Sequence, residues 1–537
     1  MPTLTSATSR RPGPRSPSEG GQETWPARWP DWWPLAALTL LAAALRLATL
    51  DLQSFWYDEA FTPVHVLRSG LGVTWRSFVH TENTPPLWYL VVWVWSRIAG
   101  TGEVALRLPS ALAGIATVPV AWGIGRELSG RRAAILAAAL VAANPLLVWY
   151  SQEARAYAFF VLFAALAMLC CLRAARVPTP RRLALFALAG ALALLSHYFA
   201  VFLLAPMALW LLWRSRGAPS PPSSGDGEIA DRRRLPAALL ACAALAVVGL
   251  ALVPLALAQG GHGTQWIGAW ALSARVEAIP QYYLTGYSAA PLGHGIELLV
   301  ALPILAGFVL ALWRALTPAE SDGALFALGV AACGVLLPLA LAALGADYLA
   351  PRNLVAAMVP LSAGIAVVVG ARRTGTIGMG LGALIAATCL ALSVDVYLSP
   401  RLQRGDWRGV AEVLRAPVQA GDVEGTRERA ITTVELGAAP LEYYVGPLHN
   451  LPRDTYVRVR EIDETGYAPL RAGAGTPPVA GFHLAARADV HGLIVYRFLA
   501  AAPRTVSEVA LRTHVITAGA HPEVLVPGHG GASTGAP

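Results

Sequence analysis

The sequence predicts an α-helical polytopic membrane protein that ends in a small mixed α/β domain. Of its 537 residues, 55% are hydrophobic and only 14% are charged, whereas soluble domains carry about 25% charged residues. The apolar residues gather in about eleven runs, each near the ~20 residues that a helix needs to cross a bilayer. After residue 398 the long apolar runs stop, and shorter helix and strand patterns replace them.

Eleven membrane-spanning helices are predicted, and a count of up to thirteen is also compatible with the pattern. They belong to a helical domain, residues 32–398. Residues 1–31, rich in Pro, Ser, Gly and Arg, precede it and are expected to form a disordered cytoplasmic tail. The predicted spans are 33–50, 104–126, 131–149, 156–173, 183–196, 198–213, 235–258, 295–314, 323–344, 353–371 and 375–397.

The segment 86–98 is apolar but too short for a typical span, which favours an interfacial or re-entrant helix. Its Trp and Tyr side chains are typical of the headgroup region. If this segment does not span, the Arg-rich connections all fall on one side, which the positive-inside rule places in the cytoplasm. The first long loop, 51–103, and the C-terminal domain then lie outside the cytoplasm at the plasma (inner) membrane.

The C-terminal domain is predicted to occupy residues 399–520 and to be followed by a flexible tail, residues 521–537. GDWRGVAEVLR (405–415) has helical spacing, and residues 440–444 can begin a second helix. AITTVEL (430–436) and GLIVYRFLA (492–500) have the composition of strands.

Most polar residues that could perform chemistry lie in the outer loops or at the outer ends of spans. The spans contain few ionisable groups, and Arg46, Arg107 and Asp395 are near enough to span ends to snorkel. Transporters and pumps usually keep such groups near the midplane, so this pattern favours a site at the membrane–water boundary. The candidate site residues are Asp58, Glu59, His80, Glu82, Gln152, Glu153, Arg155, His197, Tyr348, Arg352 and Asn353.

A boundary site suits a substrate with a lipid tail and a reactive polar head. Nucleotide sugars are absent outside the cytoplasm, so a sugar linked to a polyprenyl phosphate fits as the activated donor. Transfer needs a carboxylate base, which Asp58 or Glu59 can provide, and an apolar groove, of which segment 86–98 can form one wall. It also needs donors that hold the phosphate; the candidates are Arg155 and Arg352, with His197, Tyr348 and Asn353.

Six short motifs occur in one order along the chain. They are WYDEA (56–60), TPPLWY (84–89), LRLPS (106–110), SQEARAY (151–157), PRNL (351–354) and DWR (406–408). Over about residues 33–415 the sequence resembles the GT-C glycosyltransferases of the protein-mannosyltransferase and aminoarabinose-transferase type, glycosyltransferase family 39. The resemblance implies the GT-C fold and inverting transfer of a monosaccharide from a polyprenyl phosphate to an acceptor hydroxyl on a glycan, a lipid or a protein.

The resemblance also implies roles for single residues. Asp58 would be the catalytic base with Glu59 as its neighbour, Glu153 and Arg155 would line the site, and Arg352 would face the lipid phosphate. Asn353 departs from the pattern, because many relatives have Tyr after this arginine.

Structural roles compete with these functional ones. The Asp58–Glu59 pair can stabilise the first turn of a helix, Arg155 and Arg352 can anchor span ends at the headgroups, and Glu153 can simply pair with Arg155. The GxGxG run 378–382 lies inside a span, where close helix packing explains it better than a phosphate loop.

The sequence requires no cofactor and contains no metal-binding motif, although Asp58 and Glu153 could together hold a divalent cation. Nucleic-acid binding is not expected, because the arginines lie between the apolar runs. Two other classes stay open: a transporter or flippase of lipid-linked sugars, and a membrane-anchored binding protein whose C-terminal domain is the active part.

Overall fold

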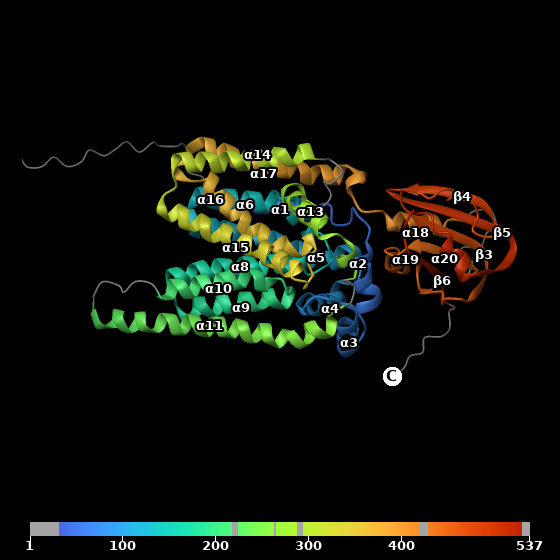
Figure 1. The fold of residues 1–537 in the computed structure, drawn as a ribbon, viewed down its shortest axis with the longest axis horizontal. Helices are drawn as coiled ribbons and strands as arrows, with labels where there is room; N and C mark the ends of the chain where they lie inside the picture. Colours follow the sequence, from blue (N-terminus) through green and yellow to red (C-terminus); the bar gives the residue numbers. More distant parts are fainter. Residues whose placement is uncertain (1–31, 217–223, 262–264, 287–293, 418–427, 529–537) are drawn as a thin grey trace, which may run out of the picture.

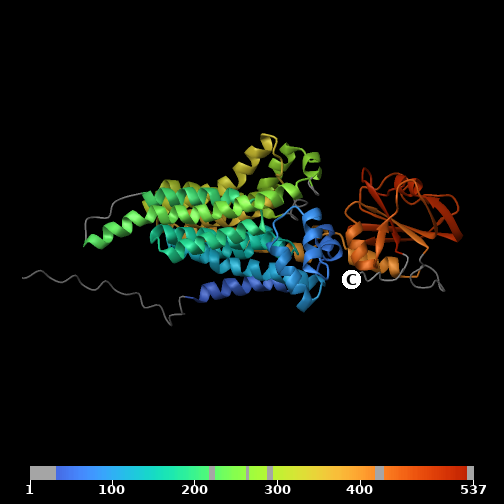
Figure 2. The ribbon, with the colours of Figure 1, turned by 90° about the horizontal axis from the view of Figure 1, so that it is seen from below.

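The computed structural model describes residues 32–216, 224–261, 265–286, 294–417 and 428–528. A long bundle of helices and a separate domain built on a β-sheet follow each other along the longest axis of the molecule (Figure 1). The view from below shows the same arrangement (Figure 2). We call the end of the bundle that faces the sheet the domain end. The predicted tail, residues 1–31, lies outside the described residues.

Every predicted span coincides with helical segments of the bundle. They are α1 (Trp33–Leu47), α5 (Glu103–Ser129), α6 (Arg131–Ala143), α7 (Pro145–Ser151), α8 (Tyr157–Arg176), α9 (Pro180–Ser196), α10 (Ala200–Arg216), α11 (Ser224–Gln259), α14 (His294–Arg314), α15 (Pro318–Ala343), α16 (Met358–Val369) and α17 (Gly375–Leu398). In the described chain, seven helices are long and apolar enough to cross a membrane, or eight if the bent pair α6–α7 is one span. The protein is therefore a multi-pass membrane protein.

The span predicted at 131–149 is broken at Asn144, where α6 and α7 meet at 56°. Pro145 has no N–H, and proline disfavours helical geometry at the residue before it. The Asn144 side chain instead caps α7 by accepting from the Leu147 N–H at 3.0 Å. The break leaves the carbonyls of Val141 and Ala142 free, and Arg46 donates to them at 3.2 and 3.0 Å.

Arg46 and Arg107 do not snorkel, contrary to the expectation from sequence. Their side chains are buried, because each finds carbonyl and carboxylate or hydroxyl partners inside the protein. Arg46 also donates to the Ser151 hydroxyl at 3.2 Å, and Arg107 donates to backbone carbonyls of the first loop and to Glu59. A buried arginine needs such partners.

Short helices cover the domain end of the bundle. They are α2 (Tyr57–Phe61), a π-helical turn at Thr62–Val66, α3 (Leu71–Thr81), α4 (Leu87–Ala99), α12 (Gln265–Ala269) and α13 (Leu272–Thr285). The prediction that segment 86–98 is a short apolar helix is confirmed. One face of α4 is buried through Trp88 and Val92, whereas Val94 and Ile98 are exposed. The sequence did not indicate α13, whose Arg275 holds Asp347 at 2.6 and 2.7 Å.

The C-terminal domain contains a six-stranded sheet with the order β2-β6-β1-β3-β5-β4. Strands β1 and β3 are parallel, and the other neighbours are antiparallel. The predicted helices and strands at 405–415, 430–436, 440–444 and 492–500 are all present. The elements are α18 (Trp407–Arg415), β1 (Arg429–Val434), α19 (Ala438–Val445), β2 (Leu448–Asn450), β3 (Tyr456–Gly466), β4 (His483–Val490), β5 (Leu493–Ser507), α20 (Glu508–Thr513) and β6 (Pro522–Pro527).

The prediction that the flexible tail begins at residue 521 is wrong, because residues 522–527 form strand β6. Strand β6 lies between β1 and β2 in the sheet, and its Val524 and Leu525 side chains are buried. The apolar residues between the two prolines therefore belong to the domain core. Residues 529–537 lie outside the described residues.

The sheet domain docks on the first loop of the bundle through α18 and α19. The Trp407 N–H donates to the Ser54 hydroxyl at 2.9 Å, and the rings of Phe55 and Tyr443 pack edge to face at 5.0 Å. Glu103, at the start of α5, accepts hydrogen bonds from the Tyr444 hydroxyl and the Arg408 guanidinium. These contacts join the sheet domain to the loop that carries Asp58.

Candidate active site

Asp58 and Arg352 form an ion pair at the domain end. Asp58 lies in α2, within the first loop, and Arg352 lies in the 3₁₀ turn Pro351–Ala357 that leads into α16. The Arg352 Nη1 donates to Asp58 Oδ2 at 2.9 Å. Both side chains keep contact with solvent, with 18% of Asp58 and 24% of Arg352 exposed. No other described residue donates a hydrogen bond to the Asp58 carboxylate, so its Oδ1 is free to accept one.

The neighbouring Glu59 has a very different environment. Its side chain is fully buried, and Arg107 donates to both of its oxygens, at 2.7 Å from Nε and 2.6 Å from Nη2. The Ala154 N–H adds a bond at 2.8 Å, and Arg404 lies at 3.4 Å. Because both oxygens are occupied, Glu59 links the first loop to α5 and to the segment before α8.

Arg155 and Glu82 form a second buried pair beside Asp58. The Arg155 Nη1 lies 3.0 Å from Glu82 Oε2 and 3.5 Å from the Asp58 carbonyl. The Tyr89 hydroxyl donates to the same Glu82 oxygen at 2.5 Å. Burial raises the pKa of Glu82 above its ordinary value, and the Arg155 charge opposes this shift. Tyr89 and Glu82 therefore hold the Arg155 side chain next to the Asp58 backbone.

Glu153 is paired with Arg404 rather than with Arg155. The Arg404 Nη2 lies 2.5 Å from Glu153 Oε2, and its guanidinium lies between two indoles, 4.6 Å from the Trp56 ring centre and 4.5 Å from that of Trp149. The Glu153 carboxylate is fully buried. Burial raises its pKa, and Arg404 is the largest opposing influence.

His197 and Asn353 lie at the edge of this cluster. His197 is buried at the end of α9, stacked on Phe160 at 4.8 Å and in contact with the Asn353 side chain. The Phe199 N–H donates to its Nδ1 at 3.2 Å. Burial and the charges of Arg155 and Arg352 lower its pKa to about 3, so the imidazole is neutral near pH 7.

The other candidate residues lie outside the cluster. The Gln152 amide binds the end of α1, at 2.7 Å from the Thr49 hydroxyl and 3.1 Å from the Arg46 carbonyl. The Tyr348 side chain is 51% exposed, and only its carbonyl contacts Asn353. His80 is exposed at the end of α3, and no described residue of the cluster binds it.

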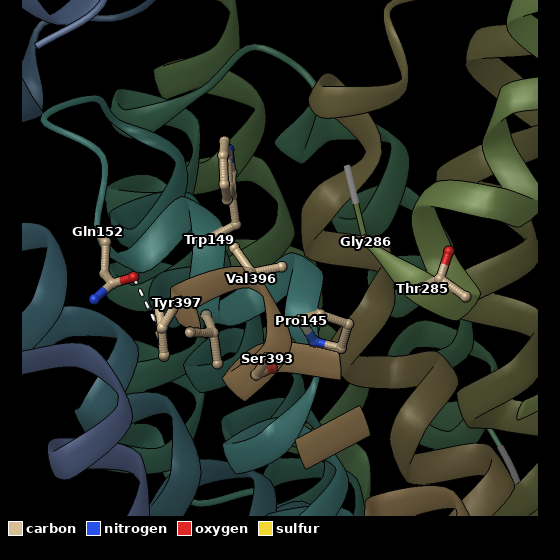
Figure 3. A pocket seen from close by; sticks show the side chains of 9 residues that line it. Pro145, Trp149, Gln152, Thr285, Gly286, Ser393, Val396 and Tyr397 are labelled. Carbon is tan, nitrogen blue, oxygen red and sulfur yellow. Dashed lines mark hydrogen bonds between the residues drawn. The ribbon is translucent and has the colours of Figure 1, made fainter. Parts of the chain in front are cut away.

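A small pocket lies next to the cluster, between α7, α17 and the end of α13 (Figure 3). Trp149 lines it from α7 and Gln152 from the residue after α7, and Tyr397 lines it from α17 and binds Gln152. Asp58 and Arg352 do not line it. It is therefore not the site around Asp58.

The described residues contain no group of three or more His, Cys, Asp or Glu side chains that could hold a metal ion. The two carboxylates that the sequence suggested for a divalent cation, Asp58 and Glu153, are each paired with an arginine instead. A cation between them would have to displace or share these guanidinium groups.

Sequence reasoning missed two arginines of the cluster. Arg107 was interpreted as a snorkelling residue, although it lies in the LRLPS motif. Arg404 received no role, although it precedes the DWR motif by two residues. The available signal was the position of Arg107 inside one motif and of Arg404 just before another.

The helical bundle has the GT-C fold, that of polytopic membrane glycosyltransferases. The apo structure of ArnT from Cupriavidus metallidurans is similar with a TM-score of 0.52 and 12% sequence identity, over 86% of this chain and 97% of that chain. The same protein bound to undecaprenyl phosphate is similar with a TM-score of 0.50, again at 12% identity, over 87% and 98% of the two chains. At this identity the likeness shows the fold alone.

The sequence comparison identifies one part of the chain more specifically. Residues 83–220 match the family model described as dolichyl-phosphate-mannose-protein mannosyltransferase. This match covers about a quarter of the chain and includes Glu153, Arg155 and His197. The expected resemblance to the GT-C glycosyltransferases is thereby confirmed. No curated protein sequence matches the chain.

Two longer proteins are similar at lower scores. The Archaeoglobus fulgidus oligosaccharyltransferase, in complex with Zn and sulfate, has a TM-score of 0.42 at 14% identity over 77% of this chain. The S. cerevisiae protein O-mannosyltransferase Pmt1–Pmt2 complex, bound to the sugar donor, has a TM-score of 0.35 at 19% identity over 42% of this chain. The chain spans only 61% and 33% of their respective lengths.

Proposed function

We propose that the protein is a glycosyltransferase that moves a monosaccharide, a hexose or a pentose, from a polyprenyl phosphate to a hydroxyl of a glycan, lipid or protein of the cell envelope. The observation that carries this proposal is the Asp58–Arg352 pair at 2.9 Å. It places a solvent-accessible carboxylate and a cation side by side at the end of a GT-C bundle. The family match at residues 83–220 supports the same class of reaction.

In the proposed reaction Asp58 is the general base. Its Oδ2 is held by Arg352, which leaves Oδ1 to accept the proton of the acceptor hydroxyl. The acceptor oxygen bonds to the anomeric carbon while the bond from that carbon to the phosphate oxygen breaks. The electron pair leaves with the polyprenyl phosphate, and displacement from the opposite face inverts the anomeric configuration.

Arg352 and Arg155 would stabilise the leaving phosphate. Charge develops on its oxygens as the bond breaks, and fixed guanidinium groups in a partly dehydrated site interact strongly with such charge. Glu82 and Tyr89 hold Arg155, so its guanidinium needs little reorganisation. Glu59, with both oxygens occupied, is proposed to position the loop rather than to take the proton.

We place the site and the sheet domain outside the cytoplasm, at the plasma membrane. Helix α5 begins at Glu103, beside the sheet domain, and runs for 27 residues, about 40 Å at 1.5 Å per residue. Arg126 in its last turn is therefore far from the domain end. Arg173 and Arg176 lie near that far end too, because both pair with Glu127, and the positive-inside rule favours the cytoplasm for such a cluster.

The test is turnover of defined donors. Purified protein in lipid is incubated with a panel of polyprenyl-phosphate hexoses and pentoses and with cell-envelope fractions, and both released polyprenyl phosphate and incorporated sugar are measured. We expect one donor to give both products in equal amounts, with the anomeric configuration inverted. Movement of an intact labelled donor across the bilayer without release of polyprenyl phosphate would instead identify a flippase.

A further inference from the structure

Arg404 contacts two buried carboxylates of the site, Glu59 and Glu153. The sequence alone did not indicate a role for it. It lies between the last helix of the bundle, α17, and the first helix of the sheet domain, α18. Its guanidinium contacts Glu153 at 2.5 Å and Glu59 at 3.4 Å. Only 14% of the side chain is exposed.

Glu153 depends on this arginine more than Glu59 does. Glu59 already has Arg107 and a backbone N–H as partners. The second oxygen of the buried Glu153 has no hydrogen-bond partner in the described chain, and Arg404 is the residue that contacts the first. Without Arg404, a buried carboxylate would be left uncompensated and would take up a proton more readily.

Trp56 connects Arg404 to the proposed catalytic pair. Its ring contacts the Arg404 guanidinium at 4.6 Å and the Arg352 guanidinium at 5.9 Å. It also precedes Asp58 by two residues. Displacement of Arg404 would therefore loosen an aromatic side chain that packs against the partner of Asp58.

The sheet domain is attached within a few residues of Arg404. The Arg404 N–H donates to the Gln53 side chain at 3.0 Å, and the Ser54 hydroxyl donates to the Gly405 carbonyl at 3.3 Å. Arg408, in the first turn of α18, binds Glu103. At its other end α18 is held to the sheet, because Arg429 donates to the Leu414 carbonyl and Arg497 donates to the Ala416 carbonyl, at 2.8 and 2.6 Å.

We propose that Arg404 is a positioning residue, which holds Glu153 and Trp56 in place beside the Asp58–Arg352 pair, and that docking of the sheet domain keeps Arg404 there. The sheet domain would then complete the site from outside the bundle. This inference rests on the proposed function. It also means that deletion of all residues after 400 would remove Arg404 together with the domain, so point variants are the sharper test.

The first experiment compares Arg404→Gln and Arg404→Lys with Arg453→Gln, a variant of an exposed arginine in the sheet domain. In the donor-turnover assay we expect Arg404→Gln to lower kcat by about tenfold to hundredfold, with KM for the donor within about twofold. Arg404→Lys keeps the charge but loses the planar stacking between the indoles, and should be intermediate. Arg453→Gln should match the wild type.

Two results would overturn the positioning role of Arg404. One is full activity of Arg404→Gln. The other is a large rise in KM with unchanged kcat, which would show that Arg404 binds the donor itself. A charge-balanced double variant, Arg404→Gln with Glu153→Gln, separates positioning from misfolding, because it leaves neither charge unpaired. We expect it to recover kcat by about threefold or more over Arg404→Gln; no recovery contradicts the role assigned to Glu153.

The pH profile gives a readout that a purely structural role would not move. In Arg404→Gln the pKa of Glu153 loses its main opposing influence and rises, so the acid side of the kcat profile should move to higher pH. An unshifted profile in a variant with reduced kcat contradicts the proposal.

The contribution of the sheet domain is tested by Glu103→Gln, which weakens the contact with Arg408. We expect a reduced kcat in the wild-type background and little further loss in the Arg404→Gln background, because coupled sites are not additive. Fully additive losses would overturn the docking part of the inference. Asp58→Asn is measured alongside: if it is active, the proposed function itself fails, whereas an inactive Asp58→Asn with a fully active Arg404→Gln contradicts only this inference.

Discussion

Asp58 and Arg352 meet at 2.9 Å although 294 positions separate them along the chain. Asp58 lies in the loop after α1, and Arg352 lies in the turn that leads into α16. Sequence motifs marked both residues, and the structure pairs them at the exposed edge of a cluster whose other carboxylates are buried. Asp58 is therefore the solvent-accessible carboxylate of the cluster, as its proposed role as the base requires.

Glu59 should matter for stability rather than for proton transfer. Glu59→Gln leaves Arg107 buried without its counter-charge, and breaking such a pair costs about 3–5 kcal/mol. We expect a lower thermal midpoint and a lower yield of folded protein in detergent. Glu127→Gln is the matched control, because its partners Arg173 and Arg176 are half exposed, and its loss should cost about 1 kcal/mol or less. Equal midpoints for the two variants would contradict the role given to Glu59.

Two glycines of α17, Gly378 and Gly380, test whether the GxGxG run is required for close helix packing. A Cβ on Gly378 would lie 2.0 Å from the Val369 carbonyl oxygen, whereas a Cβ on Gly380 would have no atom within 4 Å. Gly378→Ala should therefore destabilise the protein by about 1–3 kcal/mol. Gly380→Ala should be neutral or stabilising by up to about 1 kcal/mol, because alanine favours the helix. Thermal unfolding of both variants checks this, and a destabilised Gly380→Ala with an intact Gly378→Ala would contradict the packing account.

Because the pKa of His197 is lowered in the folded protein, the free energy of unfolding should decrease at acid pH. Its pKa is lowered to about 3 in the folded protein, against about 6.5 in the unfolded chain. Between these values the unfolded state binds more protons, so the stability contributed by the neutral imidazole is present above about pH 6.5 and is lost as the pH falls toward 3. At pH 5 the loss is on the order of 2 kcal/mol.

The variant His197→Gln should lack this pH-dependent contribution to stability. The difference in thermal midpoint between pH 7.5 and pH 5 should then be smaller than in the wild type. An identical difference would show that the acid sensitivity arises at other groups.

Hydropathy predicted the helices of the bundle, but not where a helix breaks. Proline alone does not mark the break, because α5 continues through Pro109 and Pro119. At Asn144–Pro145 the helix ends because an amide side chain is available to cap the next one. Helix α13 was missed because its apolar content is low for a span and its fold depends on contacts such as Arg275 with Asp347.

The clustering of the candidate site residues was predicted in outline. Motifs and topology brought Asp58, Arg155 and Arg352 to one end of the bundle, because each follows or precedes a span on the same side. The different environments of Asp58 and Glu59 could not be predicted from the sequence, because the two residues are adjacent in it. They depend on Arg107 and Arg404, which approach from α5 and from the segment before α18, and no local pattern encodes such long-range pairing.

The proposed mechanism is tested most directly by the rate of sugar transfer in Asp58→Asn. The variant is compared with Asp51→Asn, whose side chain lies exposed in the same loop, at equal amounts of folded protein in lipid. The account predicts a loss of kcat of roughly 10² to 10⁴-fold for Asp58→Asn and wild-type kcat for Asp51→Asn. Transfer at the wild-type rate by Asp58→Asn would contradict it.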